Sequence, residues 1–231
     1  MNKFQNPKIS KSQNPKNQES GTENRVPDWL WNGARGGFLI LVVAAIGLVV
    51  AVAGGVADPR PVGTLKWEDH FAEGARWQVF GKGVEIGDQR LEIVVGPDEI
   101  GGAVTRSEGN EFTFEVAGGQ ADGEVGAAYG IVFGYRSLES YTAVMINGNG
   151  YVEVISADGQ EHLAWSQWPN ILLDYEANRL RVDVQNGEGL IRINDEVLMT
   201  VAAADGEVGV IARGSAEGQR VRFGWAKLWG R

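Results

Sequence analysis

The sequence predicts an all-β domain, a sandwich or jelly roll, that follows a single transmembrane α-helix. Three observations support this prediction. Residues 36–57 contain no charged side chain, short strand-like runs recur after residue 64, and 33 of the 231 residues are glycine. A glycine share about twice the usual ~7% suits a sheet protein that is dense in turns. The chain is therefore expected to comprise a tail (1–35), a membrane helix (36–57), a linker (58–63) and a β-domain (64–231).

The tail sets the expected membrane topology. Asn, Lys, Gln, Ser and Pro dominate it, so it has too few apolar groups to offset the entropy of ordering and is predicted to be disordered. It carries six Lys and Arg residues against three Asp and Glu residues, which gives a net charge of +3. Because short basic flanks stay in the cytoplasm, we expect a single-pass membrane protein with a cytoplasmic N-terminus and an extracytoplasmic C-terminal domain.

The uncharged stretch 36–57 has the length of a bilayer span. A helix rises about 1.5 Å per residue, so roughly 20 residues cross the ~30 Å hydrocarbon core. A cleaved signal peptide is the alternative, because the small residues Gly55 and Ala57 suit a peptidase. The long tail and the long apolar run favour an uncleaved signal anchor. The lipid bilayer is therefore the expected partner of residues 36–57.

Charge and cysteine content narrow the class of the β-domain. The whole chain carries −9 and the tail +3, which leaves −12 for residues 58–231. Such a surface argues against nucleic acid as a partner, because nucleic-acid binding needs basic patches. The chain has no cysteine, and the domain has no Asn-x-Ser/Thr acceptor for glycosylation. Both features are typical of a bacterial envelope protein at the cell surface rather than a disulfide-bonded ectodomain.

Short apolar runs in the domain predict the strands of the sandwich. Their residue ranges are 84–86, 91–95, 112–116, 130–135, 141–146, 151–155, 180–184, 190–193, 207–212 and 221–229. Gly, Asn and Asp pairs of the kind that accept positive φ in hairpin turns separate most of them. Apolar and polar residues alternate clearly in 180–185, as in a strand with one buried face. No helix of useful length is predicted after residue 57.

Several segments of the domain resemble concanavalin A-like lectin and glucanase domains. The matching segments are 65–71 (LKWEDHF), 77–79 (WQV), 129–135 (YGIVFGY), Tyr141, 146–151 (INGNGY), 178–182 (NRLRV), 193–195 (IND) and 223–229 (FGWAKLW). Their order is similar to the laminin-G-like and 3-keto-disaccharide-hydrolase-like branches of that superfamily. The resemblance implies that segment 65–71 pairs with the last strand, 221–229. It would then gather six aromatic residues at that seam: Trp67, Phe71, Trp77, Phe223, Trp225 and Trp229.

The resemblance also implies a test for enzymatic activity. Glucanases of this fold carry Glu-x-Asp-x-x-Glu or Glu-x-Asp-x-Glu on one strand, which places the carboxylates on one face of the sheet. The sequence lacks this motif; the nearest matches, 174–176 and 194–196, lie in turn-like contexts. Glu153 is a lone carboxylate expected on the concave face, where it is either a ligand contact or an ordinary polar residue. Neither His70 nor His162 suits a Ser-His-Asp arrangement, so no catalytic residue is predicted.

Carbohydrate binding is the function that the residues favour. Sugars are held by aromatic faces and by planar polar groups, and segment 160–170 is expected to form a loop between strands, where binding residues often lie. It contains Glu161, His162, Trp165 and Trp168. Further candidates on the same concave side are Tyr135, Arg136, Tyr141, Asn147, Asn149 and Glu153. The alternative for the two tryptophans is that they plug the end of the sandwich.

Calcium is the one cofactor that the resemblance implies, because laminin-G-like domains often bind it at the rim of the sandwich. Asp98, Glu99, Asp122 and Glu124 supply acidic oxygens, but they do not form a ligand set of defined spacing. The sequence thus predicts a membrane-anchored, non-catalytic module that binds a glycan or a protein partner at the cell surface. Two alternatives are an accessory subunit of a membrane complex, since the helix is rich in small residues, and a glycoside-processing enzyme with an atypical site.

Overall fold

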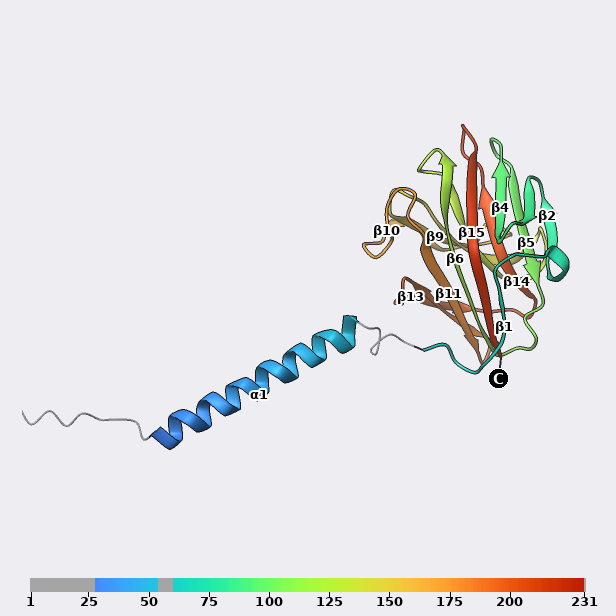
Figure 1. Cartoon of the computed structure of the whole chain (residues 1–231). Helices are drawn as coiled ribbons and strands as arrows, with labels where there is room; N and C mark the ends of the chain where they lie inside the picture. Colours follow the sequence, from blue (N-terminus) through green and yellow to red (C-terminus); the bar gives the residue numbers. More distant parts are fainter. Residues whose placement is uncertain (1–27, 54–59, 231) are drawn as a thin grey trace, which may run out of the picture. The chain divides into compact units, whose positions relative to one another are not determined.

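The computed structural model of this chain describes residues 28–53 and 60–230, and the side chains of residues 36–50 and 60–230. The chain divides into two units, Met1–Ala57 and Asp58–Arg231. Of the described residues, those in the first unit form one helix and all of the strands lie in the second (Figure 1). The two units are described separately below.

The N-terminal unit contains α1, which spans Asp28–Ala53. The helix begins at Asp28 rather than Gly36, so residues 28–35 are helical and do not belong to a disordered tail. Apolar side chains from Phe38 to Val50 are exposed along it. Among the described residues, no helix combines the length and the apolarity that a membrane span requires. The predicted disorder of residues 1–27, and the predicted end of the span and start of the linker at 54–59, lie outside the described residues.

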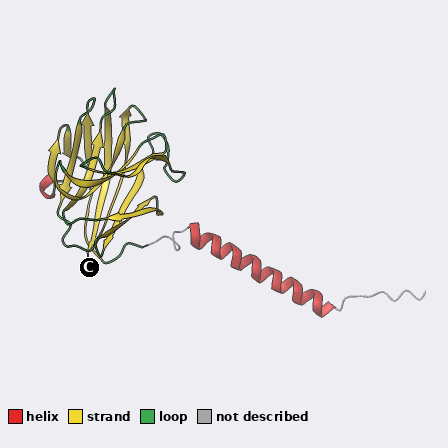
Figure 2. Cartoon of the chain, turned by 180° about the vertical axis from the view of Figure 1, so that it is seen from behind, coloured by secondary structure: helices red, strands yellow, loops and turns green. Residues whose placement is uncertain are grey.

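The C-terminal unit is a sandwich of two antiparallel sheets (Figure 2). The larger, sheet A, has eight strands in the order β13-β12-β11-β6-β15-β4-β3, with β1 paired to the end of β15. Its strands are β1 (Thr64–Asp69), β3 (Val84–Gly87), β4 (Arg90–Val95), β6 (Phe112–Gly123), β11 (Asn178–Gln185), β12 (Glu188–Ile193), β13 (Glu196–Ala202) and β15 (Gln219–Gly230). A short 3-10 helix, Gly74–Arg76, follows β1.

The second sheet, sheet B, has seven strands in the order β10-β9-β8-β7-β14-β5-β2. They are β2 (Gln78–Gly81), β5 (Ile100–Thr105), β7 (Ala128–Ser137), β8 (Ser140–Ile146), β9 (Tyr151–Ser156), β10 (Glu161–Gln167) and β14 (Glu207–Arg213). Every pair of neighbouring strands runs antiparallel. The all-β sandwich that the sequence predicts is therefore confirmed.

The main core lies between the two sheets. Its largest fully buried side chains include Phe71, Phe114, Tyr129, Phe133 and Phe223. Alternate residues of each strand point inward to this core, because successive side chains of a strand face opposite sides of the sheet. The other half of each strand faces outward, and these outward-facing residues decide what the domain can bind.

The pairing of the first and last strands is confirmed, with Leu65 opposite Trp229. The aromatic seam forms only in part. Trp77 packs against Trp67 at 6.1 Å and against Phe71 at 5.3 Å between ring centroids. Phe223 instead contacts Tyr129 in the main core, and Trp225 lies on sheet A beneath the Lys227 ammonium group. The bulge of β15 near Phe223 separates these rings onto different faces.

Four strands were missing from the sequence-based prediction: β2, β5, β10 and β13. The segment around Trp165 was predicted to be a loop, but it forms strand β10 at the edge of sheet B. Most of its side chains are exposed or half-buried, as expected of an edge strand. An edge strand with few buried side chains has no clear apolar alternation, and this is why the pattern did not reveal it.

Candidate functional site

A second, smaller apolar cluster covers the outer face of sheet B, the face turned away from the main core. It contains Phe80, Val104, Ala128, Val132, Tyr135, Ala143, Met145 and Ile211. These side chains are buried although they do not belong to the main core. The face is concave, because side chains from strands that are not neighbours meet across it. Phe80 on β2, for example, stacks on Tyr135 of β7 with ring centroids 5.0 Å apart.

A bulge in β7 brings Tyr135 to this face. Simple alternation would place Tyr135 on the core side with Ile131 and Phe133. However, the pairing of β7 with β14 contains one extra residue on β7 between Val132 and Tyr135, and Gly134 has φ +62. Glycine adopts this left-handed conformation without steric cost. The bulge therefore turns Tyr135 outward, where its ring also stacks on Tyr141 at 6.1 Å.

An ion pair crosses the same face. A guanidinium nitrogen of Arg213, at the end of β14, donates to the carboxylate of Glu153 on β9 at 2.9 Å. Strands β7 and β8 lie between them, so the two strand axes are about 14 Å apart. Glu153 is only 4% exposed, and a carboxylate so deeply buried needs a compensating charge. Arg213 supplies this charge, and 38% of its side chain still reaches solvent.

The exposed part of Arg213 lines a cavity of about 320 Å³, called here the Trp165 hollow. The rings of Tyr151 and Trp165 stand beside it, 40% and 37% exposed. Its other polar lining residues are Asn147 and Ser215. The hollow thus combines two accessible aromatic rings with a guanidinium, an amide and a hydroxyl group. This combination can stack against the C–H face of a ring and hydrogen-bond to hydroxyl groups around its edge.

Five of the predicted site residues belong to this face. Trp165 and Asn147 line the hollow, and Glu153 orients Arg213. Tyr141 lies close enough to Arg213 for the guanidinium to act on its hydroxyl, and Tyr135 stacks on Tyr141. Asn147 also has a structural role, because its side-chain oxygen accepts from the backbone N–H groups of Asn149 and Tyr151 at 3.1 Å. Asn149 itself is exposed at the tip of that turn.

The remaining predicted residues lie elsewhere. Trp168 is half-buried and packs against the main core, and it does not line the Trp165 hollow. His162 contacts the Ser156 hydroxyl at 2.9 Å within the β9–β10 hairpin, and Glu161 is exposed beside it. Arg136 donates to the backbone oxygen of Asp205 at the opposite end of the sheet. None of these three charged or polar side chains lines the Trp165 hollow.

Sequence reasoning missed three residues of the hollow: Tyr151, Arg213 and Ser215. The sequence predicts Tyr151 only as part of a strand, although alternation from the buried Val152 places it on the outer face. Arg213 follows the predicted strand 207–212, and nothing in its local sequence pairs it with Glu153, 60 residues away. Only the stacking of strands in sheet B brings these two residues together.

The part of the chain that the structure describes contains no evident set of calcium ligands. No three carboxylate or imidazole side chains there converge as a metal site. Of the acidic oxygens considered above, those of Glu99 are engaged by the Lys82 ammonium group at 2.7 Å and by the backbone N–H of Gly96. Asp122 accepts from the N–H of Gly123. Glu99 and Asp122 are thus engaged by donors of the protein itself, whereas calcium takes 6–8 oxygen ligands.

A further cavity, of about 310 Å³, lies at one end of sheet A. Arg181, Asp183 and Arg192 line it, and their charges are paired with one another and with Glu115 at 3.4–4.0 Å. It contains no accessible aromatic ring comparable to Trp165. For a hydroxyl-rich ligand, the Trp165 hollow on sheet B is therefore the better-equipped site.

No protein-family model matches this sequence, and no curated protein matches it either. Solved structures do match its fold. The carbohydrate recognition domain of Emp47p aligns with a TM-score of 0.52 and 12% identity, over 74% of this chain and 99% of that domain. The exoplasmic/lumenal domain of VIP36, solved with Ca²⁺ and Man2, aligns with a TM-score of 0.52 and 13% identity, over 71% of this chain and 88% of that one.

A third similar structure is the carbohydrate-binding module CBM66 from Bacillus subtilis. It aligns with a TM-score of 0.51 and 13% identity, over 64% of this chain and 91% of that module. At such low identities the likeness concerns the fold alone. The domain therefore shares the β-sandwich fold of these three solved domains.

Proposed function

We propose that this protein is a glycan-binding module whose binding site is the Trp165 hollow. The observation that carries the proposal is the convergence of two accessible rings, Tyr151 and Trp165, with the oriented guanidinium of Arg213. Sugars present apolar C–H faces and hydroxyl edges, and these groups of the hollow complement both. The carbohydrate-binding functions in the titles of the similar structures are consistent with this proposal but belong to those proteins.

The proposal describes a binding module rather than a glycosidase. Glycoside hydrolysis generally uses two carboxyl groups on either side of the scissile bond, as acid and as nucleophile or base. The described residues that line the hollow include no carboxylate, and Glu153 beside it is held by Arg213. Incubation of the full chain with oligosaccharides is expected to give no product. Product formation that Glu153→Gln abolishes would replace the proposal with a glycoside-processing enzyme.

The binding test compares two tryptophans on opposite sheets. Trp165→Ala should lower the affinity of the full-length protein for its glycan by roughly thirtyfold, about 2 kcal/mol, because it removes one of the two ring faces. Trp225→Ala, on the outer face of sheet A, is the matched control and should leave the affinity unchanged. A glycan array followed by calorimetry gives both values. Equal affinities for wild type and Trp165→Ala would refute the site.

We further propose that residues 36–57 anchor the module in a membrane, with the tail in the cytoplasm and the domain outside. The absence of charge over this stretch, the basic tail and the exposed apolar side chains of α1 support this. The protein should then stay with membranes in alkaline carbonate, and external protease should cleave the β-domain only. Release by carbonate would refute the anchor. Co-purification of a defined membrane complex would favour the accessory-subunit alternative.

A further inference from the structure

A second hollow lies on the same concave face of sheet B, at its other end. This cavity, of about 420 Å³, is lined by Arg76, Gln78, Arg106, Glu108 and Glu207 among others, and is called here the Arg106 hollow. Glu207 begins strand β14, and Arg213 of the Trp165 hollow ends it. Six residue steps of about 3.3 Å each place these two residues about 20 Å apart along the strand.

The stacked pair Tyr135 and Tyr141 connects the two hollows. Tyr135 lies opposite Glu207 of the Arg106 hollow in the strand register. Tyr141 stacks on Tyr135, and its hydroxyl lies close enough to Arg213 of the Trp165 hollow for the guanidinium to act on it. A tyrosine hydroxyl is ordinarily protonated at neutral pH, and burial raises the pKa of both of these hydroxyls further, so both can donate hydrogen bonds. A chain of polar groups and rings therefore runs from one end of the face to the other.

Positive and negative side chains stand together at both hollows, although the domain as a whole is strongly acidic. In the Trp165 hollow Arg213 is balanced by Glu153. The lining of the Arg106 hollow includes two arginines, Arg76 and Arg106, and two glutamates, Glu108 and Glu207. Arg76 also lies 4.0 Å from the Asp69 carboxylate outside the hollow. A face with charges of both signs and many hydrogen-bonding groups suits a neutral, hydroxyl-rich molecule. A sugar acid would meet uncompensated carboxylates from the surrounding domain, which carries −12 over residues 58–231.

We propose that the ligand of this face is a neutral oligosaccharide several units long that occupies both hollows at once. One end lies between Tyr151 and Trp165, the middle crosses the Tyr135–Tyr141 pair, and the other end contacts Gln78 and Arg106. This inference rests on the proposed glycan-binding function and adds a second subsite and a class of ligand to it. The second subsite raises affinity without a change at the first, because its contacts form within an already bound chain.

The test is a chain-length series measured by calorimetry on the full-length protein. The probes are neutral gluco-, manno- and fructo-oligosaccharides of one to six units, together with uronic-acid oligomers of the same lengths. In at least one neutral series we expect affinity to rise about tenfold or more between the shortest and the longest members. Arg106→Ala should remove most of that gain and leave the affinity for the shortest member unchanged. Tyr135→Phe, which keeps the ring stack, should remove a smaller part of the gain.

The control and the remaining outcomes separate the two proposals. Arg90→Ala removes an exposed arginine from sheet A and should change no affinity. The second subsite is refuted if affinity does not vary with oligosaccharide length, or if Arg106→Ala weakens binding equally at every length. Either outcome leaves the proposed glycan-binding function standing. Tighter binding of the uronic-acid series overturns the neutral class. No binding of any probe by the wild-type protein, with Trp165→Ala behaving identically, overturns both proposals.

Discussion

The outer faces of the two sheets use polar residues in opposite ways. On sheet A the polar groups pair with one another along neighbouring strands. Arg181 lies opposite Glu115 of β6 in the strand register, and Asp183 accepts from the Thr113 hydroxyl at 2.7 Å. On sheet B a single ion pair spans two intervening strands, and aromatic rings fill the rest of the concave surface.

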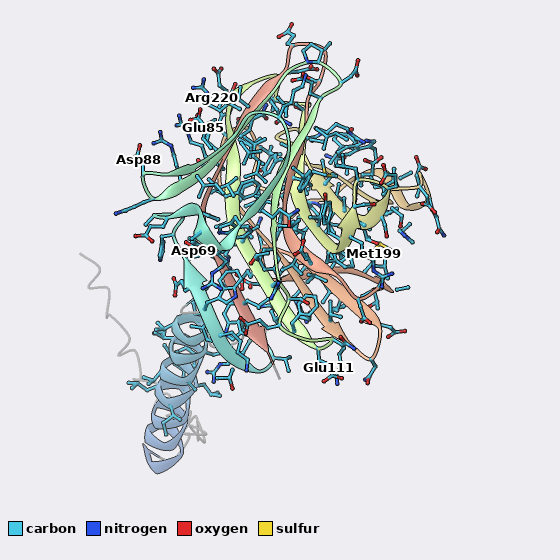
Figure 3. The ribbon with its side chains drawn as sticks, turned by 90° about the vertical axis from the view of Figure 1, so that its right-hand side faces the viewer. Asp69, Glu85, Asp88, Glu111, Met199 and Arg220 are labelled. Atoms are coloured by element: carbon cyan, nitrogen blue, oxygen red, sulfur yellow. The ribbon has the colours of Figure 1, made fainter. Side chains whose placement is uncertain are left out.

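A second ion-pair group on sheet A follows the same rule. Glu92 lies opposite Arg222, which donates to it at 2.6 Å, and Arg220 and Arg90 stand at 3.6 and 3.8 Å. Figure 3 shows Arg220 and Glu85 at this end of the sheet. The difference between the two faces indicates that polar groups paired between directly opposite residues of neighbouring strands stabilise the folded sheet. Groups joined across a concave face leave donors and rings free for a ligand.

The largest effect is expected on sheet A. Arg181→Ala removes a side chain that is 5% exposed and leaves the buried Glu115 and the half-buried Asp183 with fewer positive charges nearby. Losing one partner of a buried ion pair costs about 3–5 kcal/mol. Arg222→Ala is the control and should cost less than about 1 kcal/mol, because Glu92 keeps two arginines and the site is more exposed. Urea unfolding of the full chain measures both; similar losses would contradict the comparison.

A smaller loss of stability, with a loss of binding, is expected on sheet B. Arg213→Ala leaves Glu153 buried without its partner, but the adjacent hollow lets water approach, so we expect a cost of about 2 kcal/mol. Glycan affinity should fall at least as much as in Trp165→Ala. By contrast, Arg181→Ala should bind with wild-type affinity at temperatures where it is folded. Equal affinity losses in the two arginine variants would show that the faces do not differ in function.

The smallest effect is a difference in pH dependence. Burial raises the pKa of Glu115 above its ordinary 4.5, despite the nearby Arg181 and Arg179, whereas the hydrogen bond from Arg222 holds the pKa of Glu92 below it. The folded protein therefore binds the Glu115 proton more tightly than the unfolded chain does. Relative to Glu115→Gln, the wild type should gain stability as pH falls through the raised pKa towards about 4.5.

Glu92 should behave with the opposite sign. Its contribution is present above its unfolded pKa, near 4.5, and is lost as pH falls through the lowered folded pKa. Relative to Glu92→Gln, the wild type should thus lose stability only in acid below about pH 4.5. The test is to measure the free energy of unfolding of the wild type, Glu115→Gln and Glu92→Gln between pH 3 and 7, roughly the range in which carboxyl groups titrate. Two difference curves with the same sign would contradict the assignment of burial and hydrogen bonding as the separate causes.

The sequence by itself determined the local features of this protein. Alternation and turn residues predicted an all-β sandwich, and the segments that resemble lectin domains implied the pairing of the first and last strands, which the structure confirms. The aromatic residue Trp165 and the lone carboxylate Glu153 could also be selected in advance. These features depend on residues close together in the chain, where a period of two fixes which face a side chain takes.

Only the tertiary structure decided how these residues combine. A one-residue bulge at Gly134 turned Tyr135 to the outer face, and the edge position of β10 separated Trp165 from the core-packed Trp168. The order of strands in sheet B brought Arg213 to Glu153 across two strands. Alternation cannot specify such contacts, because it sets the face of a side chain but neither the curvature of the sheet nor the neighbours of strands distant in the chain.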